Sequence, residues 1–304
     1  MMKQISKRFK QVINYSRRHV EDLPILRKGI DRMYQKRLMN HFEYLPTLDA
    51  KDLDLVSHLR EEGVFITSLD AFDVSLASIF LTQAAKLKQS LILPTNLEKC
   101  SQPYMLATPS QVVQYPEIFL LGLNERLLKI AENYLGLPIA YHGMYFHRDF
   151  TNTLPKKSKL WHLDMEDYRS FKVIIYLNDI SNDTYGPLQY IPKEITASVV
   201  KKTGYRYGYI NDSLMSKSLS EKEWKSCLGP SGTMIFMDTA TLFHRGKVPS
   251  ATDRFAVFFD YTTRYPKRPY YCKSSLPDST LKTMAEQVSN FQKNCLLWRH
   301  ANRM

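Results

Sequence analysis

Short strand-like segments crowd the second half of the chain and constrain its fold more than any other feature. After Gly136, six runs rich in β-branched and aromatic residues follow one another, separated by Pro, Gly, Asn and Asp. They are IAYHGMYFH (139–147), KLWHLD (159–164), FKVIIYL (171–177), GPLQYI (186–191), GTMIFMD (232–238) and RFAVFFDYT (254–262). Many short strands with turn residues between them are typical of a β-barrel or jelly roll.

The first half of the chain is predicted to be mainly helical. Apolar residues recur at helical spacing in three stretches, and the first of these is basic and interrupted near Pro24. The stretches are 4–44, 71–90 and 116–135, the last of which ends before Gly136. Helices followed by strands predict an α+β fold, with N-terminal helices supporting a β core.

A shorter helix is predicted between these stretches. Thr47 or Asp49 can cap its first turn, and Gly63 suits the left-handed position that follows a helix. The segment GVFIT at 63–67 then reads as a short buried strand.

The charge of the chain is concentrated at its N-terminus. Residues 1–45 contain 11 Lys or Arg and 4 Asp or Glu, a net charge of +7, which leaves +5 of the total of +12 for the remaining residues. We therefore expect a basic arm that packs on the core with a solvated face, and we expect no nucleic-acid partner. Weak contact of this arm with a membrane surface or another polyanion stays open as an alternative.

Several classes of protein are excluded by what the sequence lacks. No apolar run approaches the roughly 18 residues of a spanning helix, and the basic N-terminus has no apolar signal-peptide core, so we expect a cytoplasmic protein. The cysteines are scattered without a C-x-x-C pair, which favours reduced, mostly buried thiols over a disulfide framework or a zinc ribbon. They are Cys100, Cys227, Cys272 and Cys295.

We expect three parts in the chain. Residues 1–46 form the basic helical arm, 47–270 the central domain, and 271–304 a helical C-terminal tail. Within the central domain, 193–230 is polar, rich in Lys and Ser, and interrupts the strands. Long inserts of this kind often act as lids over a substrate, so we expect this one to be loosely tied down.

Three side chains form a candidate metal site. His162 and Asp164 are two residues apart in a predicted strand and therefore point to the same face. His244 follows the strand 232–238, and antiparallel pairing can bring it beside them. Two imidazoles and one carboxylate on one side of a metal leave coordination positions open, which is the arrangement of non-haem Fe(II) oxygenases.

The H-x-D pattern by itself is a weak signal. A second copy, His147–Arg148–Asp149, occurs in the chain, and a single histidine is more often structural than a ligand. Arg254 strengthens the first copy, because it begins an apolar strand ten residues after His244. A buried guanidinium needs an anion, and its fork suits the distal carboxylate of 2-oxoglutarate.

With these motifs together, the chain resembles the phytanoyl-CoA dioxygenase-like oxygenases over about residues 50–265. The matching pieces, in order, are EEGVFIT (61–67), WHLD (161–164), FKVIIYLNDI (171–180), YGPLQYIP (185–192), GTMIFMDTATLFHRG (232–246) and Arg254. The resemblance assigns the metal site to the WHLD copy of H-x-D and leaves His147 outside it. It also implies that the β core is a double-stranded β-helix.

The resemblance implies an activity and a cofactor set. Fe(II) would be held by His162, Asp164 and His244, and 2-oxoglutarate by the iron and by Arg254, with Tyr145 and Tyr176 as further candidate contacts. A small organic substrate and O₂ would then react, with 2-oxoglutarate converted to succinate and CO₂. Halogenating relatives have a small residue in place of the carboxylate, so Asp164 favours hydroxylation.

Three departures from the family pattern concern the substrate and co-substrate. Lys193–Glu194 stands where the family has Gly-Ser-His after Ile-Pro, and Gly232–Thr233 replaces the usual Gly-Asp. Gly246 occupies a position that in the family often has a small residue with a side-chain hydroxyl. The family's substrates therefore do not transfer to this chain.

Two other functions remain open from the sequence. One is a cupin-type metal enzyme that does not use 2-oxoglutarate, for which Arg254 is the discriminating residue. The other is a catalytically idle β-helix domain that binds an anionic partner through the basic arm.

Overall fold

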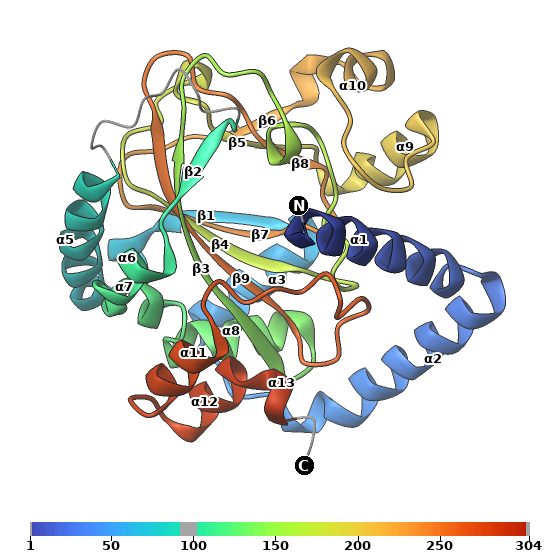
Figure 1. Cartoon of the computed structure of the whole chain (residues 1–304), viewed down its shortest axis with the longest axis horizontal. Coiled ribbons are helices and arrows are strands. Elements are labelled where there is room, and N and C mark those ends of the chain that lie inside the picture. The colour runs from blue at the N-terminus through green and yellow to red at the C-terminus, as the bar shows by residue number, and fades with distance from the viewer. Residues whose placement is uncertain (1, 92–101, 302–304) are drawn as a thin grey trace.

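A six-stranded antiparallel sheet forms the centre of the molecule (Figure 1). The computed structural model describes residues 2–91 and 102–301. The strand order is β1 (Val64–Ser68), β7 (Thr233–Asp238), β4 (Phe171–Tyr176), β9 (Arg254–Thr263), β3 (Ile139–Asp149) and β2 (Tyr104–Leu106). A three-stranded sheet has the order β6 (Lys225–Cys227), β5 (Leu188–Tyr190) and β8 (His244–Gly246). The expected α+β class is confirmed.

Alternating side chains of the large sheet are buried on opposite faces. On β4, Val173 and Ile175 pack with the helical core, whereas Ile174 and Tyr176 pack with the small sheet through Leu188. The period of two along a strand explains this division. One face of the large sheet is thus covered by helices, and the space between the two sheets lies on the other face.

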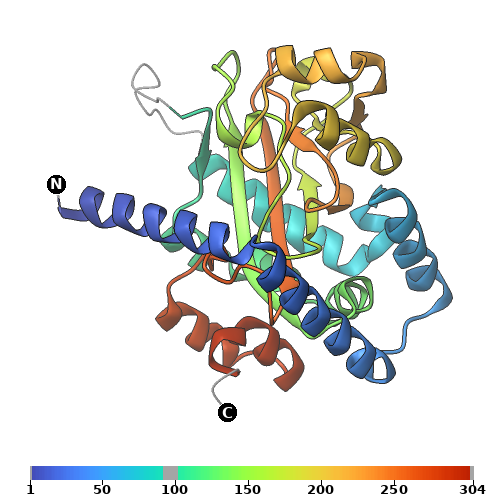
Figure 2. The same cartoon turned by 90° about the vertical axis from the view of Figure 1, so that its right-hand side faces the viewer.

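The predicted N-terminal helices are present. The arm forms α1 (Met2–Glu21) and α2 (Pro24–His41), which meet at an angle beside the sheet (Figures 1 and 2). Pro24 is the first residue of α2, where its missing N–H costs no hydrogen bond. In α3 (Ala50–Glu62), the Asp49 side chain accepts a hydrogen bond from the Asp52 N–H, and Gly63 adopts a left-handed φ of 77°.

The structure has two helices where the sequence predicted a single one. Instead of a single helix over 116–135, the chain forms α7 (Pro116–Leu121) and α8 (Glu125–Leu135). The Asn124 side chain accepts a hydrogen bond from the Leu127 N–H and so starts a new helix. Before β3, the described residues also form α4 (Leu69–Phe72), α5 (Val74–Ser90) and α6 (Pro109–Val113).

The insert 193–230 is ordered rather than loosely tied down, so that expectation was wrong. It contains α9 (Lys193–Thr203) and α10 (Asp212–Ser218), and its end forms β6 of the small sheet. A separate hydrophobic cluster anchors it, made of Trp161, Ile191, Val199, Ile210, Met215 and Phe243. Trp161 and Phe243 directly precede His162 and His244, so the insert packs behind both histidines.

The described part of the C-terminal tail contains α11 (Asp278–Ala285), α12 (Asn290–Leu296) and α13 (Trp298–Ala301). Cys227, Cys272 and Cys295 are free and buried, and Cys100 lies outside the described residues. Within the described part of the chain, no helix is long and apolar enough to cross a membrane.

Candidate metal centre

Backbone pairing brings His162 and His244 face to face. Each residue donates its N–H to the carbonyl of the other, at 3.1 Å from His162 and 3.0 Å from His244. Directly opposed residues of an antiparallel pair project to the same side, and the two ring centroids lie 4.2 Å apart. The predicted strand 159–164 is reduced to isolated bridges at Trp161 and His162, yet this local pairing is enough to position the ring.

Asp164 completes the predicted group. Its carboxylate oxygens lie 3.7 Å from His162 Nε2 and 4.0 Å from His244 Nε2. The Asp164 N–H donates to the Thr239 carbonyl at 2.9 Å, which fixes the backbone beside the other ligands. One donor atom from each of the three residues lies within 4.8 Å of the others. The structure thus brings together the three side chains that the sequence singled out.

Hydrogen bonds set the tautomer of both imidazoles. His162 Nδ1 lies 2.9 Å from the Leu160 carbonyl, and His244 Nδ1 lies 3.1 Å from the Leu242 carbonyl. A carbonyl can only accept, so Nδ1 carries the proton in each ring and Nε2 keeps its lone pair. Burial lowers the pKa of His162 and lowers that of His244 to about 3. Both rings are therefore neutral, which is the form that binds a metal.

Lys172 holds the Asp164 carboxylate. Its Nζ lies 2.7 Å from Asp164 Oδ2 and 3.8 Å from Asp260 Oδ1. Burial opposes ionisation of Asp164, but the Lys172 ammonium outweighs it and holds the pKa of Asp164 below its usual range. The sequence reasoning missed Lys172, although a lone charge within the apolar run 171–177 was a usable signal.

A cavity of about 240 Å³, here called the inner cavity, lies beside the histidines between the two sheets. Residues lining it include Tyr104, Tyr145, His147, Lys159, His162, Lys172, His244, Gly246 and Arg254. Arg254 was expected in this cavity. The guanidinium is 1% exposed, which agrees with the predicted burial.

The anion beside Arg254 is a residue of the chain itself. The β3–β9 register pairs Asp149 with Arg254, and Arg254 Nε donates to Asp149 Oδ2 at 2.7 Å. Lys159 Nζ lies 2.5 Å from the other oxygen, Asp149 Oδ1. Burial opposes the charge on Asp149, but Arg254 and Lys159 keep its pKa below the usual range. Two cations and one carboxylate leave a net charge of +1 in this cluster.

The second H-x-D copy has a different role from the first. Asp149 is the counter-ion of Arg254, and His147 Nδ1 lies 4.0 Å from Asp149 Oδ1. Within the described residues, the group that could hold a metal contains neither His147 nor Asp149. Sequence reasoning missed Lys159, and no pattern marks it as buried.

The two tyrosine candidates differ. Tyr145 lines the inner cavity and donates its hydroxyl to the Lys273 carbonyl at 3.1 Å. The Tyr176 hydroxyl donates to the Cys227 carbonyl at 3.0 Å and accepts from the Leu188 N–H at 2.9 Å. Tyr176 is therefore a core residue between the sheets, and we no longer assign it a co-substrate contact.

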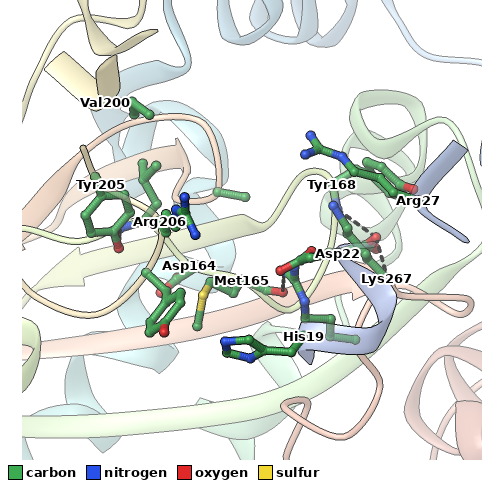
Figure 3. A pocket seen from close by; sticks show the side chains of 15 residues that line it. His19, Asp22, Arg27, Asp164, Met165, Tyr168, Val200, Tyr205, Arg206 and Lys267 are labelled. Atoms are coloured by element: carbon green, nitrogen blue, oxygen red, sulfur yellow. Dashed lines mark hydrogen bonds and ion pairs between the residues drawn. The ribbon is translucent and has the colours of Figure 1, made fainter. Parts of the chain in front are cut away.

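A larger cavity of about 770 Å³, here called the outer cavity, lies on the other side of Asp164 (Figure 3). Its lining includes Asp164 and Met165 from the ligand loop, Arg206 from the insert, and His19 and Arg27 from the arm. The arm, which was expected only to pack on the core, therefore supplies part of a cavity wall that also contains Asp164.

Comparisons with known proteins do not assign this chain to a family. No family profile and no curated protein sequence matches the chain. Among solved structures, it is similar to EctD from S. alaskensis with 2-oxoglutarate and 5-hydroxyectoine (17% identity, 71% of this chain and 76% of that chain, TM-score 0.49). It is also similar to HygX from Streptomyces hygroscopicus with nickel and 2-oxoglutarate bound (16%, 72% and 88%, 0.46) and to the non-heme alpha ketoglutarate dependent epimerase SnoN (13%, 71% and 83%, 0.43). Because these likenesses are weak, we infer function from this chain's own side chains.

Proposed function

We propose that this chain is a non-haem Fe(II)- and 2-oxoglutarate-dependent oxygenase that hydroxylates a small organic substrate. The observation that carries the proposal is the convergence of His162, Asp164 and His244, with each Nε2 within 4.0 Å of an Asp164 carboxylate oxygen. Two imidazoles and one carboxylate suit Fe(II), and they leave positions for other ligands. We further propose that the two sheets are the halves of a double-stranded β-helix and that the chain is related to the phytanoyl-CoA dioxygenase-like enzymes.

The residues of the chain fit the metal and its co-substrate. Iron bound here would supply activation of O₂ coupled to oxidative decarboxylation of 2-oxoglutarate. Lys172 would keep the Asp164 carboxylate in one orientation, as an outer-shell partner does in metal sites. The net positive cluster of Arg254, Lys159 and Asp149 would bind the distal carboxylate of 2-oxoglutarate in the inner cavity.

A second candidate function follows from the same cluster. Because Arg254 already has Asp149 as its partner, a metal enzyme that does not use 2-oxoglutarate would need no further anion there. The two candidates differ in whether the inner cavity binds 2-oxoglutarate at all. Direct binding of the co-substrate therefore separates them.

The test combines binding with turnover. Full-length protein loaded with Fe(II) without oxygen is titrated with 2-oxoglutarate, and succinate is then measured after air is admitted. We expect saturable binding and slow succinate release, and we expect Arg254→Ala to weaken 2-oxoglutarate binding about 100-fold, since a buried charged contact is lost. Metal binding without any 2-oxoglutarate binding would favour the second candidate and end the first.

A further inference from the structure

The carboxylates of the outer cavity are all engaged. Asp164 contacts Lys172, and Asp22 accepts a hydrogen bond from Arg268 at 2.8 Å. Asp167 accepts from the N–H and hydroxyl of Thr263 and from two further backbone N–H groups. Asp164 and Asp22 are thus paired with cations, whereas the donors to Asp167 are neutral and leave its negative charge in the cavity.

Apart from Arg268, the positive groups of the same cavity form no close contact with a carboxylate among the described residues. Among the described residues, the Arg206 guanidinium and the Lys267 ammonium form no ion pair, and Lys267 Nζ lies 4.8 Å from the centroid of the Tyr168 ring. Arg27 reaches Asp31 only at 3.9 Å, and its side chain is 60% exposed. Burial and the neighbouring charges of Arg268 and Arg27 lower the pKa of Lys267, and the charges of Asp31 and Asp22 offset part of this shift. Four cationic side chains and three carboxylates line the cavity, which leaves a net charge of +1.

Two segments far apart in the sequence hold these groups together. The Arg18 guanidinium lies 3.5 Å from the centroid of the Tyr207 ring, and it is 5% exposed. The rings of Tyr15 and His19 also contact Tyr207 edge-on. These contacts join the arm to the insert, and Figure 3 shows Arg206 on one side of the cavity with His19 and Arg27 on the other.

The outer cavity also has apolar lining residues, and its lining residues differ in how exposed they are. Leu163, Met165 and Val200 line it together with the cations. Arg206 is exposed, whereas the Asp164 side chain is only 12% exposed. A substrate that fills this space would contact exposed positive charge, apolar side chains and the metal ligand Asp164.

We propose that the prime substrate carries an oxyanion group, such as a phosphate or a carboxylate, that Arg206, Lys267 and Arg27 bind at the rim of the outer cavity. Its organic part lies against Leu163, Met165 and Val200 and reaches the metal centre past Asp164. This inference rests on the proposed function, and it adds the substrate class. Guanidinium and ammonium groups recognise such oxyanions, and Arg206 and Lys267 have no ion-pair partner among the described residues.

The first test measures anion binding without any metal. Metal-free, full-length protein is titrated calorimetrically with inorganic phosphate and separately with acetate, which distinguishes the two oxyanions. We expect the double variant R206Q/K267Q to bind the preferred anion about ten-fold more weakly, because two charge-assisted contacts are lost. The control K201Q/K217Q removes the same charge from exposed lysines of α9 and α10 and should bind as the wild type does.

Every outcome of this titration decides the proposal. Equal weakening in both variants would reveal a general charge effect and overturn it, as would wild-type protein that binds neither anion. Thermal unfolding shows whether the variants are folded. Because no metal or 2-oxoglutarate is used, the result is independent of the turnover assay, whose failure would count against the proposed function alone.

A second test uses turnover. Succinate release is compared for matched pairs of compounds that differ only in an anionic group, such as a phosphate ester and its free alcohol. We expect only the anionic member of a pair to stimulate release, and we expect R206Q/K267Q to lose that stimulation while the control K201Q/K217Q keeps it. Stimulation by the uncharged members would overturn the proposal.

Discussion

At the scale of single residues, the two H-x-D copies show how similar patterns acquire different chemistry. Both pairs lie near the inner cavity, but only His162 is paired through its backbone with His244. Asp149 is instead occupied by Arg254 and Lys159. The period of two along a strand was enough to predict that His162 and Asp164 share a face. This strand period could not indicate that Lys159 and Lys172 form ion pairs at the site, because their partners come from other segments of the chain.

This difference predicts opposite effects for two alanine substitutions. His162→Ala should abolish metal-dependent succinate release and weaken metal binding strongly, because one of three ligand side chains is lost. His147→Ala should retain both, since its ring is outside the group that could hold a metal. Metal titration and the succinate assay check both variants. The reverse result would mean that the metal belongs to the second H-x-D copy.

Asp149→Asn tests the charge cluster of the inner cavity. The substitution leaves Arg254 and Lys159 buried without their carboxylate, so we expect the free energy of unfolding to fall by about 3–5 kcal/mol. Added 2-oxoglutarate should restore more stability to this variant than to the wild type, because its carboxylate replaces the missing anion. Urea unfolding with and without 2-oxoglutarate measures both effects. Equal stabilisation of the two proteins would argue against 2-oxoglutarate binding at this cluster.

The same variant has an expected pH dependence. Since the pKa of folded Asp149 is below its usual range, its ionisation stabilises the fold fully above the unfolded pKa of about 4. That contribution is lost as the pH falls below this value. The difference in unfolding free energy between wild type and Asp149→Asn should therefore shrink between about pH 4 and pH 2. A constant difference over this range would show that Asp149 does not contribute through its charge.

At the scale of elements, the sequence identified segments with strong periodicity and missed those held by distant contacts. The helix caps at Asp49 and Gly63 were readable, because a cap depends on local chemistry. The insert 193–230 was misread, because its few apolar residues pack on Trp161 and Phe243 from outside the segment. No pattern within the segment alone predicts a cluster that is built from distant parts of the chain.

Substitutions in α10 test whether the insert is anchored. Met215 is fully buried in the cluster beside Trp161, so Met215→Ala should lower the free energy of unfolding by about 2–5 kcal/mol. Leu214, its neighbour in the same helix, is 43% exposed, and Leu214→Ala should change stability by about 0.5 kcal/mol or less. Urea unfolding compares the two. Equally small changes in the free energy of unfolding for both variants would indicate that the insert is loosely held, as first expected.

At the scale of the whole molecule, the arm is part of the site's support. Composition identified it as a basic helical extension but not where it packs, since docking depends on the complete surface of the folded domain. In the structure, Arg268 bonds to Asp22 of the arm at 2.8 Å and to the Met165 carbonyl at 3.2 Å. The Tyr168 hydroxyl donates to Asp31 at 2.6 Å. Both contacts hold the loop that follows Asp164.

These contacts predict that the arm affects metal binding from a distance. In the full-length double variant D22N/D31N, the loop after Asp164 loses two charged partners, so the carboxylate should be less well positioned. Outer-shell contacts of this kind typically change metal affinity 10- to 100-fold, and we expect a loss of about 10-fold. The control D54N/D70N removes the same charge from exposed residues of α3 and α4 and should bind metal as the wild type does. Anaerobic Fe(II) titration measures the affinities, and circular dichroism checks that the helices remain. Unchanged affinity in D22N/D31N would mean that the arm only covers the outer cavity and leaves the metal ligands unaffected.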